Sequence, residues 1–222
     1  YQVIYFGDTA RCPYGTKGEN VIKQYARENA QFLIDRGATI IVIACNTASA
    51  LAVDAVKQAV HVPVYEVISA GCEAAVTASK SGRIGMIGTR ATVGSHAYAK
   101  RLKTLNPNLI TSELACPLFV PLIEEGEIKG KIINLVLSKY LQEVRKWQVD
   151  TLILGCTHYP LIADLVDKQL GGGVILINSG QELARKLPKL AGNGKDRYFL
   201  TDVTPRFINT AELFLGYDIG AK

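Results

Sequence analysis

Gly37-Ala38-Thr39-Ile40-Ile41-Val42-Ile43-Ala44-Cys45-Asn46-Thr47 and Val149-Asp150-Thr151-Leu152-Ile153-Leu154-Gly155-Cys156-Thr157-His158 are two stretches of the chain that share one plan. In each, a row of aliphatic residues predicts a buried strand, which leads through a small residue to a cysteine, a threonine and the start of a helix. Ligands of open α/β sheets bind beyond the carboxyl ends of the strands. We therefore expect both cysteines to lie at a ligand-binding site.

The rest of the chain extends this pattern. Short β-branched runs alternate with helical periodicities, which predicts an α/β fold with parallel strands and helices on both faces. Apolar residues at helical spacing predict helices over residues 19–36 and 129–147. Strands are expected over residues 3–6, 39–44, 62–67, 83–87, 109–114, 151–154, 174–177 and 197–200.

Composition narrows the class of protein. The chain has 222 residues, 48% hydrophobic and 20% charged, which suits one large globular domain or two compact ones and excludes a disordered chain. Apolar runs such as residues 40–44 are far shorter than the ~18 residues of a membrane span, so we expect a soluble protein. The net charge of +5 is too small to predict nucleic-acid binding.

Cysteine usage indicates the compartment. Five cysteines without a CxxC or histidine-rich pattern predict reduced thiols in a cytoplasmic protein, not a disulfide scaffold or a structural zinc site. Residues 82–88 are rich in glycine but lack the GxGxxG spacing, so we expect no dinucleotide. No metal or other cofactor is expected.

Two thiols facing one small anion suit a reaction that moves a proton between the two faces of a stereocentre. One thiolate removes a proton as base, the other thiol returns one as acid, and a cysteine pair can exchange these roles. The transition state needs fixed donors, for which Asn46, Thr47, Thr157 and the N–H groups at both helix starts are available. The alternative is that each cysteine is a small buried hydrophobe, but core packing does not require the same strand end twice.

Five blocks of the sequence follow one another along the chain: Asp8-Thr9-Ala10-Arg11-Cys12-Pro13-Tyr14-Gly15, Ala44-Cys45-Asn46-Thr47-Ala48-Ser49, Gly88-Thr89-Arg90-Ala91-Thr92-Val93, Cys116-Pro117-Leu118-Phe119-Val120-Pro121-Leu122-Ile123-Glu124 and Gly155-Cys156-Thr157-His158-Tyr159-Pro160-Leu161. Together they resemble glutamate racemases, and the similarity runs nearly end to end. This resemblance implies two pseudo-symmetric, doubly wound parallel-sheet domains, residues 1–68 plus 180–222 and residues 69–179, with the active site in the cleft between them. It also implies cofactor-independent interconversion of L- and D-glutamate, which supplies D-glutamate for peptidoglycan.

The resemblance also implies roles for particular residues. Cys45 and Cys156 become the two acid/base thiols, and His158 and Glu124 become helpers of Cys156. Without the family, Glu124 beside Glu125 is more typical of a solvated face. The implied substrate-binding positions, with Thr89 as a weaker candidate, are Tyr14, Gly15, Asn46, Thr47, Thr92 and Thr157. The cysteines and histidines expected to be bystanders are Cys12, Cys72, Cys116, His61 and His96.

The sequence also departs from the family. Its members begin with a strand and an Asp-Ser-Gly turn whose aspartate assists the first thiol, whereas this sequence opens at Tyr1 directly in an expected strand. We therefore expect about thirty further N-terminal residues, which would lie beside that strand near Cys45. Asp8 belongs to a different motif and does not take that role. Ala70 and Asn178 stand where the family often has proline and aspartate.

Other functions stay open at this point. A racemase for aspartate or a related acid would use the same chemistry, although the Cys-Thr-His-Tyr-Pro block favours glutamate. A catalytically silent binding protein would keep the cleft without the N-terminal aspartate. A thiol–disulfide enzyme is disfavoured because no vicinal cysteine pair is present. The oligomeric state is open, with a homodimer among the alternatives, and no membrane or nucleic-acid partner is expected.

Overall fold

The structure, a computed structural model, describes residues 2–188 and 194–216. Its strands are β1 (Ile4–Gly7), β2 (Ile41–Ile43), β3 (Val64–Glu66), β4 (Arg83–Gly88), β5 (Ile110–Ala115), β6 (Thr151–Gly155), β7 (Ile175–Asn178) and β8 (Arg197–Leu200). Its helices are α1 (Glu19–Ile34), α2 (Asn46–Leu51), α3 (Val53–Ala59), α4 (Val67–Ala78), α5 (Arg90–Ser95), α6 (Ala97–Leu105), α7 (Phe119–Glu124), α8 (Lys131–Lys146), α9 (Ala163–Leu170), α10 (Ser179–Lys186) and α11 (Pro205–Leu215). Short 3-10 turns are η1 (Thr9–Arg11), η2 (Tyr14–Thr16) and η3 (Tyr159–Ile162).

Each strand expected from the sequence is present, and the differences lie at the ends. The expected strand over residues 62–67 ends one residue early, at Glu66, because its carboxylate accepts hydrogen bonds from the N–H groups of Ile68 and Ser69 at 2.6 and 2.9 Å and so begins α4. The expected helices over residues 19–36 and 129–147 shorten to α1 and α8. Tyr1, where we expected the first strand to open, lies outside the described residues.

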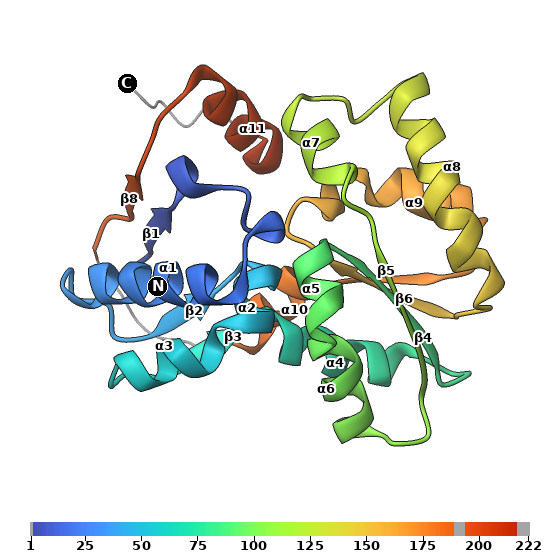
Figure 1. Ribbon diagram of the computed structural model, residues 1–222, viewed down its shortest axis with the longest axis horizontal. Coiled ribbons are helices and arrows are strands. Elements are labelled where there is room, and N and C mark those ends of the chain that lie inside the picture. Colours follow the sequence, from blue (N-terminus) through green and yellow to red (C-terminus); the bar gives the residue numbers. More distant parts are fainter. Residues whose placement is uncertain (1, 189–193, 217–222) are drawn as a thin grey trace.

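Four parallel strands in the order β5-β4-β6-β7 form the sheet of one domain, the four-stranded domain, on the right of Figure 1. Leu152 and Leu154 of β6 pack with α7, α8 and α9 on one face, whereas Ile153 packs with α4 and α6 on the other. This alternation gives the predicted doubly wound arrangement, with both faces covered. The chain leaves β4 for β5 on one side and returns to β6 on the other, so the switch point lies between the carboxyl ends of β4 and β6.

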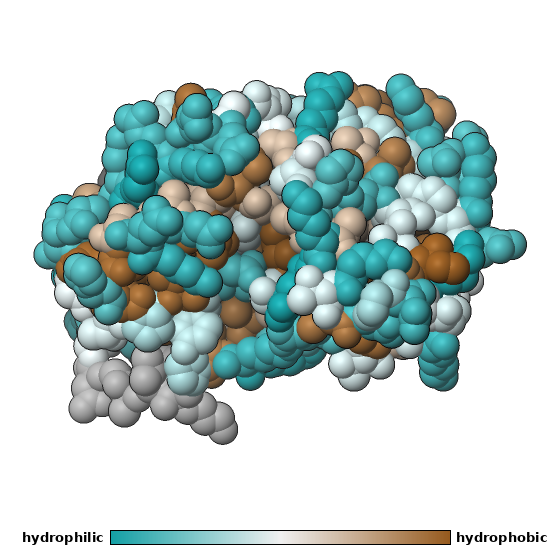
Figure 2. All heavy atoms as spheres, turned by 60° about the horizontal axis from the view of Figure 1, so that its bottom comes forward, coloured by the Kyte–Doolittle hydropathy of each residue, from teal (hydrophilic) through white to brown (hydrophobic). Residues whose placement is uncertain are grey.

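The other domain, which we call the two-sheet domain, contains two parallel strand pairs, β1 with β8 and β2 with β3. Its core joins α1 to β2, α2 and α3 through residues such as Ile22, Ile41 and Val56. Val3, Tyr5 and Val42 are exposed by 45%, 45% and 37%, so part of this domain presents apolar side chains to solvent. In Figure 2, which shows a largely hydrophilic face, brown apolar atoms gather in the left half and between the two halves.

The domains are joined where α4 packs along α10, with a small shared core of Val67, Ala70 and Leu183. Gly71 of α4 faces Ser179 at the start of α10, and a Cβ on Gly71 would lie 2.6 Å from Ser179 Oγ, so glycine permits this close approach.

Asn178, one of the two departures from the family, caps α10 because its Oδ1 accepts hydrogen bonds from the N–H groups of Gly180 and Gln181. The domain ranges 1–68 plus 180–222 and 69–179 stay a prediction, and residues 189–193 and 217–222 of these ranges are outside the described part. Within that part, no helix combines the length and the apolar character that crossing a bilayer requires.

Candidate active site

Cys45 stands directly before α2, two residues after the end of β2, at the carboxyl end of a parallel strand. The backbone N–H groups of Thr47 and Ala48 and the Thr47 hydroxyl are placed to donate to its sulfur. Burial raises the pKa of Cys45, and these three donors oppose the rise because they stabilise the thiolate.

Cys156 follows β6 directly and repeats this arrangement. Its donors are the backbone N–H groups of His158 and Tyr159, two and three residues further along, which is the spacing of Thr47 and Ala48 after Cys45. Burial raises the pKa of Cys156 to about 12, and negative charge on Cys45 and Glu124 adds to the rise. The two thiols thus share the positions of the N–H groups that lower their pKa as well as a sequence pattern.

The two cysteine turns touch each other although they belong to different domains. Thr157, next to Cys156, donates through Oγ1 to the backbone oxygen of Ala44 at 3.2 Å and to Oδ1 of Asn46 at 3.5 Å, and these residues flank Cys45. The two thiols are also close enough for charge on Cys45 to raise the pKa of Cys156. The structure therefore brings both candidate thiols to one place.

His158 joins Cys156 to Glu124. The Nδ1 atom of His158 lies 3.8 Å from Cys156 Sγ, and its Nε2 atom lies 3.2 Å from Glu124 Oε1. The ring of Phe214, from α11, packs edge-on against the imidazole with 5.6 Å between the ring centroids. A carboxylate that orients a histidine beside a thiol is an arrangement that can move a proton to and from the sulfur.

Three threonine hydroxyls form a closed cluster at the junction of the domains. The Oγ1 atoms of Thr47 and Thr89 are 3.0 Å apart, those of Thr47 and Thr92 are 3.2 Å apart, and those of Thr89 and Thr92 are 2.9 Å apart. Gly15 packs directly against this cluster, since a Cβ there would lie 2.7 Å from Thr89 Cβ. Hydroxyls that can rotate to donate are suited to a carboxylate.

Tyr14 is placed differently from a residue whose hydroxyl binds a ligand. Its hydroxyl donates to Asp8 Oδ2 and also accepts a hydrogen bond from Asn29 Nδ2 at 3.2 Å. Asp8 accepts a further hydrogen bond from Arg11 Nε at 2.8 Å. The Tyr14 hydroxyl therefore holds its own loop together.

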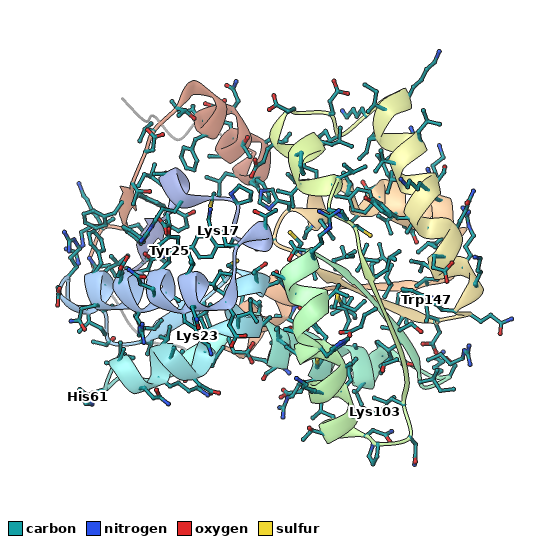
Figure 3. The ribbon with its side chains drawn as sticks, viewed as in Figure 1. Lys17, Lys23, Tyr25, His61, Lys103 and Trp147 are labelled. Carbon is teal, nitrogen blue, oxygen red and sulfur yellow. The ribbon has the colours of Figure 1, made fainter. Side chains whose placement is uncertain are left out.

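Four of the five residues that we expected to take no part in the site, two cysteines and two histidines, have other surroundings in the fold. Cys72 and Cys116 are buried, and Cys72 Sγ donates to the backbone oxygen of Tyr98 at 3.8 Å. His96 pairs with Glu113 at 2.8 Å, and Figure 3 places His61 at the outer end of the two-sheet domain.

Cys12 is the exception among them, because it lies near the candidate site. The residue is exposed to solvent, but the protein packed around its sulfur, followed by the charges of Cys45, Asp8 and Glu124, raises the pKa of Cys12 to about 12. Across residues 2–188 and 194–216, the structure brings no three His, Cys, Asp or Glu side chains together as a metal site.

Some residues at the site have little or no signal in the sequence. Thr89, which the sequence makes a weaker substrate-binding candidate than Thr92, makes as many hydrogen bonds as Thr92 within the hydroxyl cluster. Phe214 lies outside the five blocks of sequence. The hydroxyl of Tyr98 accepts a hydrogen bond from Asn46 Nδ2 at 2.7 Å, although the sequence around Tyr98 indicates only an apolar position of a helix. Their contacts join distant segments, so only the assembled fold reveals them.

Comparisons with known proteins identify the family of this chain. The family model described as Asp/Glu/Hydantoin racemase matches residues 2–187. The chain belongs to this racemase family. A glutamate racemase from Geobacter metallireducens is 43% identical to it over 227 residues, which cover 98% of this chain and 84% of the relative.

Solved structures of racemases share the fold. A glutamate racemase from Francisella tularensis, in complex with D-glutamate, is 38% identical to this racemase, with a TM-score of 0.90 over 99% of this chain and 85% of that one. A glutamate racemase from Bacillus anthracis is 35% identical, with a TM-score of 0.94 over 100% of this chain and 86% of that one. The present racemase is thus an isomerase with the two-domain α/β fold expected from its sequence.

Proposed function

We propose that this racemase interconverts L- and D-glutamate by moving a proton between two thiols. The thiolate of one cysteine removes the α-proton, which leaves the electron pair in an enediolate-like transition state, and the thiol of the other returns a proton to the opposite face. Cys45 and Cys156 take these roles and exchange them in the reverse direction. The observation that carries the proposal is the matched pair of strand-end thiols, each facing N–H groups two and three residues further on.

Each side of the site is equipped differently for this task. His158, oriented by Glu124, takes and returns the proton of Cys156. On the other side, the Thr47 hydroxyl and the N–H groups of Thr47 and Ala48 stabilise the thiolate of Cys45. Donors at both helix starts also stabilise the negative charge that develops on the substrate carboxylate.

The substrate is bound by the residues around the thiols. Thr47, Thr89 and Thr92 receive a carboxylate of glutamate, and Gly15 closes the site against Thr89. Asn46 and Thr157, which directly follow the two cysteines and contact each other at 3.5 Å, contact the groups on the α-carbon. Glutamate is supported as substrate by relatives that are glutamate racemases over nearly the whole of this chain.

The product serves peptidoglycan synthesis, and the reaction takes place in the cytoplasm without a cofactor. The five cysteines fit that compartment, since each is a free thiol.

Incubation with L-glutamate, and separately with D-glutamate, in deuterated water tests the proposal. We expect deuterium at the α-position of the product after chelation of metals, and no absorbance between the protein band and the visible. Aspartate is assayed in parallel. Exchange into aspartate but not glutamate would contradict the substrate, and binding of glutamate without exchange would contradict the enzyme activity.

Single cysteine variants test the two-base mechanism. Cys45→Ser and Cys156→Ser should abolish racemisation and keep the fold, because serine is a close isostere of cysteine. A glutamate analogue with a leaving group on its β-carbon needs only one base to eliminate it. Each variant should therefore retain elimination from one enantiomer, and the two variants should retain opposite ones. Equal loss of elimination from both enantiomers in both variants would show that the two thiols do not act on opposite enantiomers.

A further inference from the structure

Tyr98 places a buried hydroxyl where the starts of two helices meet. It belongs to α6, is fully buried and packs in the core of the four-stranded domain. Its hydroxyl accepts a hydrogen bond from Asn46 Nδ2, at the start of α2, at 2.7 Å. The same hydroxyl lies 2.9 Å from Oγ of Ser179, at the start of α10.

Only one of these two hydrogen bonds has a fixed direction. The Tyr98 hydroxyl accepts from the Asn46 amide, whereas in its hydrogen bond with Ser179 either hydroxyl can be the donor. Burial raises the pKa of Tyr98, so the hydroxyl keeps its proton.

The amide of Asn46 is held at both ends. Nδ2 is bound by Tyr98, and Oδ1 accepts the hydrogen bond from Thr157 at 3.5 Å. Asn46 is only 4% exposed, so water offers little replacement for either partner. Without the Tyr98 hydroxyl, a buried N–H group would lack an acceptor and the amide could rotate.

Asn46 occupies a sensitive position, because it directly follows Cys45 and contacts the turn of Cys156 through Thr157. Tyr98 reaches it from the other domain and, through Ser179, is tied to the α4 and α10 junction. The hydroxyl of Tyr98 itself is buried, and its hydrogen-bond partners are Asn46 and Ser179.

We propose that Tyr98 is a positioning residue for racemisation, whose hydroxyl holds the Asn46 amide in its working orientation and acts on the reaction only through Asn46. This inference rests on the proposed function, in which Asn46 contacts the groups on the α-carbon.

A double-mutant cycle with Tyr98→Phe and Asn46→Ala tests the role, with solvent deuterium exchange into glutamate as the assay and thermal unfolding as the measure of stability. We expect Tyr98→Phe to lower kcat/KM by about tenfold or more per folded protein. In the Asn46→Ala background the same change should alter kcat/KM by less than about twofold while it still lowers Tm. A purely structural role would lower Tm in both backgrounds and leave kcat/KM intact.

Tyr140→Phe is the matched control. Its hydroxyl accepts a hydrogen bond from the N–H group of Leu118 on the opposite face of the same sheet, so the variant should keep wild-type activity. Should Tyr98→Phe give no folded protein, Ser179→Ala replaces it in the cycle, and its loss of activity should likewise vanish in Asn46→Ala.

Equal losses of activity in both backgrounds, or no loss in Tyr98→Phe, would overturn the positioning role. Wild-type protein that fails to exchange the α-hydrogen of glutamate would overturn the proposed function as well, so the two failures are distinguishable.

Discussion

Replacing Gly15 by alanine pushes a methyl group from the two-sheet domain into the four-stranded domain. The added Cβ would lie 2.7 Å from Cβ and 2.8 Å from Cγ2 of Thr89, about 1 Å closer than carbon atoms normally pack. Thr89 is poorly able to turn away, because its Oγ1 caps α5 through the N–H group of Thr92 and is hydrogen-bonded to the Thr47 hydroxyl. The loop of Gly15 and α5 must therefore separate by about 1 Å.

The size of the effect follows from that displacement. Overpacking of this kind costs about 1–3 kcal/mol, which corresponds to a fall in Tm of roughly 2–12 °C for a chain of this size. A shift of about 1 Å in a group that positions substrate can lower the rate on the order of a hundredfold. We expect kcat/KM to fall by about 10- to 100-fold in both directions, because the hydroxyl cluster serves both enantiomers.

The assay compares racemisation of L- and D-glutamate, measured by circular dichroism, with thermal unfolding of the same samples. Gly18→Ala is the matched control, because a Cβ at Gly18 would meet no atom within 4 Å. If Gly15→Ala stays within about twofold of Gly18→Ala in kcat/KM and within about 2 °C of it in Tm, the contact with Thr89 does not constrain the site and the reasoning is wrong.

Two further predictions concern stability. Tyr14→Phe removes the hydroxyl that donates to Asp8, so we expect a loss of about 1–3 kcal/mol in chemical denaturation with KM for glutamate unchanged, whereas a raised KM would return the Tyr14 hydroxyl to the binding site. Burial raises the pKa of Cys156 to about 12, while a thiol in the unfolded chain titrates near 8.5, so the unfolded state loses this proton first and the free energy of unfolding falls as pH rises between these values. Cys156→Ser lacks this thiol and therefore this loss. Its free energy of unfolding in urea, minus that of the wild type, should rise by about 2 kcal/mol between pH 7 and pH 10, whereas an unchanged difference would contradict the raised pKa.

The parts of the fold that the sequence predicts well are those decided locally. The strands that precede Cys45 and Cys156 are marked by their aliphatic runs. Cys45 leads directly into α2 as expected, whereas the turn after Cys156 leads into the 3-10 turn η3 before α9 begins. A run of apolar residues does not mark its own ends, so β2 is shorter than expected, and β3 ends where the Glu66 carboxylate caps the next helix.

Contacts between segments that are distant in the sequence are harder to predict. Thr89 and Thr47 are 42 residues apart and Asn46 and Tyr98 are 52 apart, and neither pair shares a periodicity or a motif. Hydrogen bonds of this kind depend on how the two domains dock, which no local pattern records. The hydrogen bond from the Tyr14 hydroxyl to Asp8 is likewise set by the folded loop, and the sequence does not mark it.

The closed triangle of Thr47, Thr89 and Thr92 has a consequence for how the site changes when it fills. Each hydroxyl has one proton, and in the triangle that proton can be directed to a neighbouring oxygen. An arriving anion can attract the same protons by rotation about single C–O bonds, with no heavy atom displaced and no rotamer changed. Only the hydroxyl groups of the three side chains then rotate, and the empty and the filled site would differ here mainly in the positions of hydrogen atoms.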